Sequence, residues 1–339
     1  MGDIKRRTGI HVIRIKKEQT MKKILIISSS IVVSLLVIIT ICASFYLYSY
    51  ALARDNSSMN DTATTDETTA TAKLAKKNRE ENVAWMEKQK LTQWTEKTAD
   101  DLKLVATYLA ADKPSNTTII LAHGYRGKSG KVEMAGLARM YHEKFGYNVL
   151  MPDARAHGES EGENIGFGWP ERKDYVEWID QVIDKNGTDT QIALHGVSMG
   201  SSTVLMTSGE KLPKQVKSVI ADCGYTSMDA ELSYQLKAMF HLPKFPIIQT
   251  ASLINKAKEG FFFSEASAVD AVAKTDLPIF YIHGDSDAFV PTYMVDELYD
   301  ATNSYKEKWI VKGAEHGQAF TIDPKTYEEK VRQFLNKTM

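Results

Sequence analysis

The sequence predicts an α/β fold with a mostly parallel, doubly wound sheet and a helical cap insertion, preceded by one transmembrane helix. Three observations support this prediction. From residue 100 onward, apolar strand-like runs alternate with helical segments, a pattern typical of parallel sheets covered by helices. Residues 225–272 interrupt that alternation, and a long uncharged apolar run lies near the N-terminus. The 339 residues are enough for one large or two ordinary domains.

The N-terminal region divides into a basic segment, residues 1–23, and an apolar segment, residues 24–53. The first holds eight Lys or Arg side chains, and the second carries no charge. About 20 apolar residues span a bilayer as a helix, so we expect residues 24–53 to form a single-pass transmembrane helix or uncleaved signal anchor. Because Lys and Arg favour the cytoplasmic side, we expect a cytoplasmic N-terminus and an extracellular domain.

Other interpretations of the apolar segment stay open. The letters "ALA" at 51–53 fit a cleavage site, which would give a secreted protein after cleavage near Ala53. Met21 is an alternative start, in which case residues 1–20 are not expressed. A buried helix of a soluble protein is disfavoured because the run is uncharged on every side. Cys42 and Cys223 cannot pair across this arrangement, and the net charge of −1 points to no nucleic-acid partner.

The remainder of the chain is expected to be a polar linker and one globular domain. Residues 54–73 are rich in Thr, Ser, Asn and Asp, a composition typical of a flexible linker, which would hold the domain away from the membrane. Residues 74–339 would form the domain. Its first segment, 74–95, has apolar residues at helical spacing and is predicted to be an amphipathic helix.

The elements of the domain follow from the apolar runs. Residues 102–109 alternate and are predicted to be an antiparallel strand near a sheet edge. Residues 117–124 are a continuous apolar run that suits a buried parallel strand. Five further strands of the sheet are expected at 147–153, 190–196, 216–224, 277–285 and 306–314. Helices are expected at 130–145, 170–185, after residue 198, at 291–303 and at 323–337. The insertion at 225–272 is rich in Met, Phe and Leu and is predicted to cap a substrate pocket.

A serine between two glycines lies where a predicted strand meets a predicted helix, in the sequence Gly196-Val197-Ser198-Met199-Gly200. Glycines allow a tight turn that projects the serine at the top of the sheet. Serine is a weak nucleophile at neutral pH and needs a histidine base oriented by a carboxylate. The pattern therefore indicates a nucleophile only if those partners follow it.

The partners are present in the order that this chemistry requires. On such turns the serine is followed along the chain by an acid and then by the histidine. His316 is the one of the eight histidines that lies after the last strands. Asp285 and Asp287 follow the preceding strand, and we favour Asp287 because Asp285 directly follows a glycine and suits a turn. All three residues would lie at the carboxyl ends of parallel strands.

Two backbone N–H groups are expected to stabilise the negative charge that develops during the reaction. Met199, at a helix N-terminus, would supply one. Tyr125, in the loop "AHGYRG", would supply the other, while His123 supports that loop. The cluster "PDARAHGES", with Asp153, is expected to make loop hydrogen bonds and ion pairs.

Several of these motifs together resemble the α/β-hydrolase superfamily over residues 97–337. They are "LAHGYRG", "MPDARAHGESEG", "GFGWPERKDYVEWID", "HGVSMGSSTVL", "VIADCGYTSM", "IHGDSDAFVP" and "AEHG". The set looks like bacterial membrane-anchored serine esterases related to Bem46-like and ABHD13-like hydrolases. The resemblance implies Ser198 as nucleophile, Asp287 as acid, His316 as base, and the Tyr125 and Met199 amides as oxyanion donors, with no metal or cofactor.

The function expected from the sequence is that of a serine hydrolase acting on a small-molecule or lipid-like carboxylic ester. A peptidase or acyltransferase using the same three residues is the alternative, and a non-enzymatic surface protein is disfavoured because none of the three is missing. Met239, Phe240 and the Phe261–Phe263 run could line an acyl pocket or form the cap's own core. The sequence sets neither the acyl length nor the oligomeric state.

Overall fold

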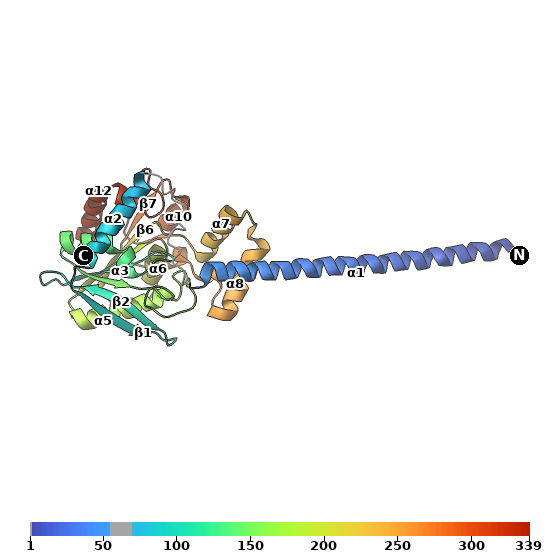
Figure 1. Cartoon of the computed structure of the whole chain (residues 1–339), viewed down its shortest axis with the longest axis horizontal. Helices are drawn as coiled ribbons and strands as arrows, with labels where there is room; N and C mark the ends of the chain where they lie inside the picture. The colour runs from blue at the N-terminus through green and yellow to red at the C-terminus, as the bar shows by residue number, and fades with distance from the viewer. Residues whose placement is uncertain (1, 55–69) are drawn as a thin grey trace.

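The computed structural model describes residues 2–54 and 70–339, and for residues 2–16 the backbone alone. Within them, one sheet has the strand order β1-β2-β4-β3-β5-β6-β7-β8 (Figure 1). The strands are β1 (Leu91–Lys97), β2 (Lys103–Leu109), β3 (Thr117–Ala122), β4 (Asn148–Pro152), β5 (Gln191–Val197), β6 (Val216–Asp222), β7 (Ile279–Gly284) and β8 (Lys306–Val311). From β4 through β8 all neighbours pair in parallel, and the β1–β2 hairpin joins β4 in the antiparallel sense. The predicted fold class is confirmed.

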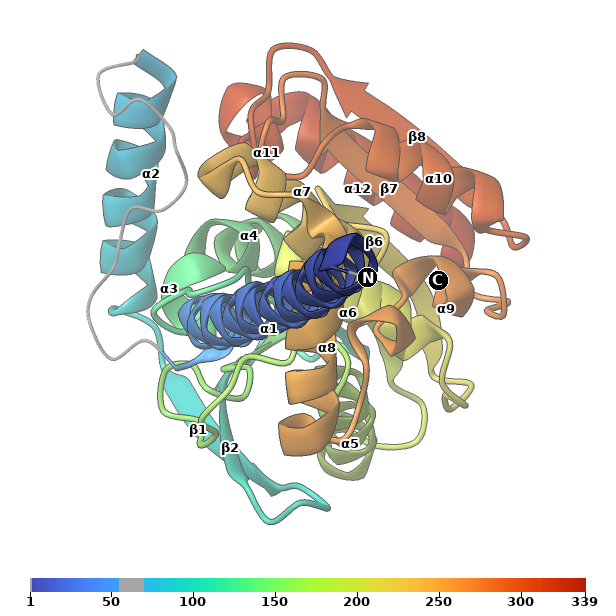
Figure 2. The same cartoon turned by 90° about the vertical axis from the view of Figure 1, so that its right-hand side faces the viewer.

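Helices cover both faces of the sheet (Figure 2). The helical elements of the described residues are α1 (Gly2–Leu52), α2 (Ala70–Met86), α3 (Gly130–Glu133), α4 (Ala135–Arg139), the π-helix η1 (Met140–Phe145), α5 (Glu171–Asn186), α6 (Met199–Ser208), α7 (Met228–Phe240), α8 (Lys244–Glu259), the 3₁₀ turn η2 (Phe263–Glu265), α9 (Ala268–Val272), α10 (Tyr293–Ala301), α11 (Ala319–Ile322) and α12 (Pro324–Thr338). One core lies between the sheet and α5, α6 and α10, and includes Trp178 and Leu205. The other lies under α2, α4 and α12, and includes Leu137 and Phe334.

The segment predicted as one helix over 74–95 is two elements, so that prediction is wrong at its C-terminal end. The helix ends at Met86, and residues 91–97 form strand β1. Trp94, which fitted a helical stripe, is instead buried on the strand and stacks on Tyr108 of β2 with ring centroids 4.4 Å apart. A cross-strand aromatic contact of this kind stabilises a sheet edge. The spacing of apolar residues within 74–95 cannot show it, because the partner ring lies on another strand.

The insertion at 225–272 is helical, as expected. It contains α7, α8, η2 and α9. In Figure 1, α7 and α8 lie on the side of the domain from which α1 emerges. The cap therefore lies between the sheet and the free part of α1.

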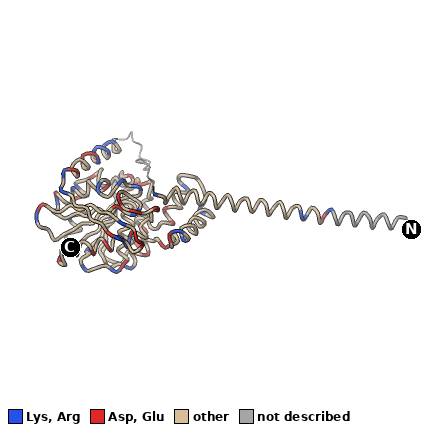
Figure 3. Tube along the Cα trace, turned by 60° about the horizontal axis from the view of Figure 1, so that its bottom comes forward, with Lys and Arg blue, Asp and Glu red and all other residues tan. Residues whose placement is uncertain are grey.

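Helix α1 is long and apolar enough, from Lys17 to Leu52, to cross a membrane. Its side chains are almost all exposed through residue 43, and the stretch beside the domain carries no Lys, Arg, Asp or Glu (Figure 3). From Ser44 onward the helix packs on the domain: Ser44, Tyr48 and Leu52 are buried. The Ser44 hydroxyl donates to the Ile247 backbone oxygen at 3.2 Å.

The end of α1 differs from the expected separation of membrane helix and domain. We expected a polar linker to hold the domain away from the membrane. Residues 55–69 of that linker lie outside the described residues. The chain just before it is already attached to the domain, because the Arg54 N–H donates to the Glu163 oxygen at 2.7 Å and Ala53 forms a β-bridge with Asn164.

A buried ion pair fastens the β1–β2 hairpin to α5. The Arg155 guanidinium donates to both carboxylate oxygens of Asp174, at 2.9 and 2.7 Å, and to Asp100 in the hairpin turn at 2.8 Å. The neighbouring carboxylates hold the pKa of Arg155 above its ordinary value, although burial alone would lower it. The expected role of this loop in hydrogen bonds and ion pairs is thus confirmed.

We predict that Arg155→Met lowers the free energy of unfolding by about 3 kcal/mol, because it leaves the Asp174 carboxylate buried without its partner. A urea titration of the full chain in mild detergent measures this change. The matched control is Arg139→Met, which removes an exposed ion pair with Glu143 and should cost under about 1 kcal/mol. Equal losses in the two variants would contradict the prediction.

Candidate active site

Ser198 lies in the sharp turn between β5 and α6, in a backbone conformation that serine rarely adopts. Its φ is 57° and its ψ is −122°, and strain of this kind persists only where the surroundings enforce it. A Cβ atom on Gly196 would overlap the backbone of Gly200, and one on Gly200 would overlap the backbone of Ala122. The Ser198 N–H donates to the Asp222 backbone oxygen at 2.9 Å. The two glycines and this hydrogen bond hold the serine at the top of the sheet.

The structure brings together the three side chains that the sequence selected. The Ser198 Oγ lies 2.7 Å from His316 Nε2, and His316 Nδ1 lies 2.8 Å from Asp287 Oδ2. Ser198 follows β5, Asp287 follows β7, and His316 follows β8. A Cβ atom on Gly284 would overlap the backbone of Ala314, so the loops that carry Asp287 and His316 can meet only because that position is glycine.

Asp287 is held in its ionised form and in a fixed orientation. Burial would raise its pKa, but hydrogen bonds from His283 and His316 and the electrostatic interaction with both imidazoles outweigh that effect and lower the pKa to about 2. Its Oδ1 also accepts the Phe289 and Val290 N–H groups, each at 2.9 Å. The other candidate acid, Asp285, accepts the Gly313 N–H at 2.6 Å instead.

The two predicted oxyanion donors flank the serine. Met199 is the first residue of α6, so its backbone N–H has no acceptor within the helix. Tyr125 follows Gly124, where a Cβ atom would lie 3.5 Å from the Ser198 Cβ. His123 lies behind this loop: its Nδ1 is 2.8 Å from the Gly124 oxygen, and its Nε2 accepts the Ala154 N–H at 2.9 Å. That arrangement matches the supporting role expected for His123.

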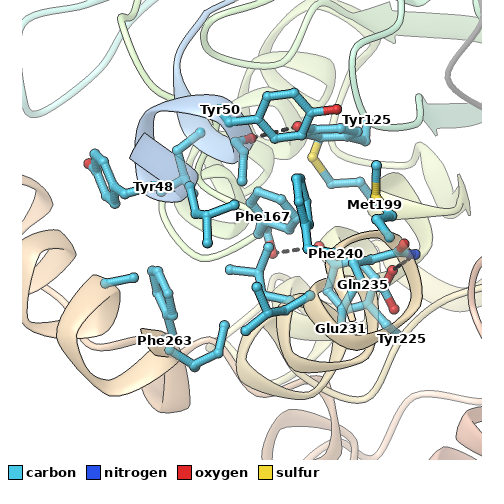
Figure 4. A pocket seen from close by; sticks show the side chains of 18 of the residues that line it. Tyr48, Tyr50, Tyr125, Phe167, Met199, Tyr225, Glu231, Gln235, Phe240 and Phe263 are labelled. Carbon is cyan, nitrogen blue, oxygen red and sulfur yellow. Dashed lines mark hydrogen bonds between the residues drawn. The ribbon is translucent and has the colours of Figure 1, made fainter. Parts of the chain in front are cut away.

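A cavity opens beside Ser198, with an empty volume of about 970 Å³ that includes its mouth. Its walls are mostly aliphatic and aromatic. Of the cap residues considered for such a pocket, Met239, Phe240 and Phe263 line it, and Phe261 packs toward Trp169 instead, with ring centroids 6.4 Å apart. Figure 4 shows side chains from α1, from the cap and from the loops around Tyr125 and Phe167 facing this space.

Sequence reasoning missed that α1 supplies one wall of this cavity. The lining includes five residues from the end of the helix: Leu47, Tyr48, Tyr50, Ala51 and Leu52. In the sequence, Tyr46, Tyr48 and Tyr50 at the end of the apolar run are typical of membrane-interface side chains. No local signal separates a tyrosine in a headgroup layer from one that packs on a distant part of the chain.

Glu231 in α7 is a second residue that the sequence analysis did not select. Its side chain is buried and lines the cavity. One carboxyl oxygen accepts from Gln235 Nε2 at 2.8 Å, and the other has no hydrogen-bond partner. Burial raises the pKa of Glu231 to about 8, the Gln235 hydrogen bond opposes this, and the charge of Asp287 adds to it. The sequence does hold one signal that could have identified it. Glu231 and Gln235 are four residues apart and therefore neighbours on one helix, next to the apolar pair Leu232 and Leu236.

Other polar groups surround the serine and histidine. Asp222 at the end of β6 accepts from the Tyr327 hydroxyl at 2.9 Å, and burial raises its pKa to about 6. Buried Cys223 lies next to it, and burial raises the pKa of its thiol. Among the described residues, polar atoms of Cys223, Asp287 and His316 lie within 4.8 Å of one another and could hold a metal ion. Two of the three side chains are already hydrogen-bonded to each other, and a neutral thiol is a weak ligand.

Comparisons with known proteins agree with this architecture. Residues 117–246 match a family model described as the alpha/beta hydrolase fold. The uncharacterized protein YqkD of Bacillus subtilis (strain 168) is 30% identical over 233 residues, which are 68% of this chain and 74% of that protein.

Two solved structures share the fold at lower identity. The Pyrococcus furiosus esterase Pf2001 superposes with a TM-score of 0.60 at 23% identity, over 76% of this chain and 94% of that one. The Pyrococcus horikoshii acylaminoacyl peptidase superposes with a TM-score of 0.54 at 17% identity, over 75% of this chain and 42% of that one. The fold thus has both an esterase and a peptidase among its neighbours.

We predict that Glu231→Gln makes the protein less sensitive to alkaline pH. The pKa of Glu231 is about 8 in the folded state and has an ordinary value near 4.5, so between these values the folded chain keeps a proton that the unfolded chain loses. Stability then falls as pH rises through this window, and glutamine removes the effect. The melting temperature of the variant minus that of the wild type should increase by roughly 5 °C from pH 5 to pH 9.

Thermal unfolding at a series of pH values measures this difference. The matched control is Glu177→Gln, the same substitution at an exposed position of α5. A difference that is flat with pH, or that develops equally in the control, would contradict the burial argument.

Proposed function

Because this chain belongs to the α/β-hydrolase superfamily, we propose that it is a serine hydrolase that cleaves carboxylic esters through an acyl-enzyme. The observation that carries the proposal is the unbroken line of hydrogen bonds from Ser198 through His316 to Asp287. A hydroxyl on a strained strand-to-helix turn, a histidine within reach of it and a carboxylate behind the histidine are the groups that nucleophilic catalysis requires.

The proposed reaction begins with attack by the Ser198 oxygen on the ester carbonyl carbon. His316 Nε2 takes the hydroxyl proton as the new C–O bond forms. With its proton on Nδ1 directed at Asp287, the imidazole presents Nε2 as the base, and the ionised carboxylate stabilises the imidazolium. The tetrahedral intermediate collapses as the ester C–O bond breaks, and His316 gives its proton to the leaving alkoxide. Water then repeats the sequence on the acyl-serine and releases the acid.

The negative oxygen of the intermediate would be stabilised by the backbone N–H groups of Met199 and Tyr125. Met199 brings the positive end of α6 toward that oxygen, and the Tyr125 loop lies against the serine. Preorganised donors of this kind contribute several kcal/mol to a reaction barrier. The chemistry calls for no metal or cofactor.

An ester is favoured over a peptide by the character of the cavity. Its walls are apolar, and a peptide needs backbone partners that an apolar wall does not supply. A peptidase or acyltransferase using the same three residues is the alternative outcome. We further propose that α1 is an uncleaved anchor with a cytoplasmic N-terminus and an extracellular catalytic domain, and that the substrate is a small or lipid-like ester.

We predict that a fluorophosphonate probe labels the wild-type protein at Ser198 and fails to label Ser198→Ala, because the probe reacts only with an activated hydroxyl. Labelling is measured from the mass of the intact protein and by identifying the modified peptide by mass spectrometry. Ser202→Ala is the matched control: it removes a hydroxyl four residues along the same helix, one that bonds to the Tyr225 backbone instead, and should still be labelled.

Labelling that survives Ser198→Ala would overturn the assignment of the nucleophile. Turnover of p-nitrophenyl esters compared with p-nitroanilides of the same acyl group then separates the candidate reactions. Faster anilide turnover would favour the peptidase over the esterase.

We predict that the mature protein keeps residues 24–53 and remains in the membrane fraction after carbonate washing. Cleavage near Ala53 would remove buried Leu52, whose backbone oxygen accepts the Ile165 N–H at 2.7 Å, and would open one wall of the cavity. Intact mass of the protein extracted from membranes measures this. A mature N-terminus at residue 54 would contradict the prediction.

A further inference from the structure

The end of the membrane helix is built into the wall of the reaction cavity. Tyr125, the proposed oxyanion residue, donates its hydroxyl to the Ala51 backbone oxygen at 2.6 Å. The neighbouring Arg126 guanidinium donates to the Tyr50 backbone oxygen. Both acceptors are carbonyl groups of the last turn of α1, which have no partner within the helix. The helix end and the loop beside the nucleophile therefore satisfy each other's polar groups.

The cap contacts the end of α1 and forms the adjoining part of the cavity wall. The Tyr50 and Phe240 rings meet edge to face with centroids 5.8 Å apart, and both side chains face the cavity (Figure 4). The Tyr48 hydroxyl donates to Glu259 of α8 at 3.4 Å. The cavity is thus enclosed jointly by α1 and by the cap.

The length of α1 sets where this wall lies relative to a bilayer. The uncharged run begins at Ile24, and at 1.5 Å per residue about 20 residues span the hydrocarbon core. That span ends near Ala43. The next residue, Ser44, is the first that packs on the domain. Residues 44–46 alone separate the end of that span from Leu47, the first residue of the cavity wall, so an inserted α1 would hold the cavity within about one helical turn of the membrane surface.

The outer surface of the cap is also suited to a lipid boundary. Three large apolar side chains of the cap are exposed and lie outside the cavity lining: Phe245, Leu253 and Phe262. Lys258 at the end of α8 lies with its Nζ 5.2 Å from the centre of the Phe45 ring of α1. An exposed apolar surface with an adjacent cation and aromatic rings is typical of the headgroup layer.

We propose that the substrate is a long-chain acyl ester of a membrane amphiphile, whose acyl chain passes from the bilayer into the cavity between α1 and the cap. This inference rests on the proposed function, since Ser198 is the group that would receive the acyl chain. The apolar walls take the chain without hydrogen-bonding it. The unpartnered oxygen of Glu231 in the cavity lining is a polar group available to the alcohol part of the ester.

The test uses the full chain in vesicles of phosphatidylcholine and phosphatidylglycerol, with p-nitrophenyl dodecanoate and p-nitrophenyl acetate as substrates. Leu47→Trp fills the cavity from the α1 side, and Leu36→Trp makes the same change at an exposed position of α1. The wild type should prefer dodecanoate, and Leu47→Trp should lower the dodecanoate-to-acetate ratio of kcat/KM by at least about tenfold. Leu36→Trp should keep that ratio within about twofold.

Each outcome has a definite meaning. A wild-type preference for acetate, or a ratio that Leu47→Trp leaves unchanged, would overturn the membrane substrate while leaving an esterase. A Ser198-dependent enzyme that turns over anilides only would overturn the ester substrate itself. Absence of Ser198-dependent turnover of any substrate would overturn the proposed function.

A second measurement does not depend on turnover. In a Cys42→Ser background, Leu47→Cys is treated with a maleimide before and after reaction of Ser198 with a dodecyl or an ethyl fluorophosphonate. The dodecyl group should protect the introduced thiol and the ethyl group should not. Ser49→Cys, on the same turns of α1 but outside the cavity lining, should react equally in all cases. Equal labelling of Leu47→Cys after both inhibitors would show that the chain does not reach α1.

Discussion

The turn between β5 and α6 is the constraint on which the rest of the site depends. Ser198 keeps a left-handed backbone conformation only because the strand before it and the helix after it are packed too closely for any other path. Gly196 and Gly200 allow that approach, and Asp222 fixes the Ser198 N–H from the adjacent strand. The same tight turn places Met199, the first residue of α6, directly after the serine, where its backbone N–H is the proposed oxyanion donor. The strained turn thus holds two groups, the Ser198 side chain and the Met199 N–H, in fixed positions before a substrate binds.

A parallel sheet explains why residues so far apart in sequence can meet around that turn. Its strands all end at one edge, so the loops after β3, β5, β7 and β8 converge there. His316 and Ser198 are 118 residues apart and bond directly. The central strands are buried on both faces and supply rigidity, whereas the cap insertion leaves from the same edge after β6. Cap residues can therefore change the shape of the cavity without moving the hydrogen-bonded line beneath it.

The sequence was sufficient to predict the features that depend on local pattern or on the order of residues along the chain. The apolar runs predicted the parallel strands, and the order of serine, aspartate and histidine selected the three side chains that the structure brings together. It was insufficient where long-range contact decides. Strand β1 was interpreted as helix because the burial of Trp94 depends on Tyr108 across the hairpin. The end of α1 could not be assigned to the cavity, because the contact of Ser44 with Ile247 joins segments 203 residues apart.

That last contact changes how the N-terminal region should be understood. A membrane anchor on a flexible tether would only raise the local concentration of an enzyme near lipid. Here backbone oxygens in the final turn of α1 accept hydrogen bonds from the side chains of Tyr125 and Arg126, and Leu52 is buried in the main core. In the proposed anchored state, a tilt of the helix in the bilayer would be coupled to the wall beside the serine. A tethered domain would be indifferent to such a tilt, whereas under the proposed anchorage the docked helix would make the membrane part of the environment that shapes the cavity.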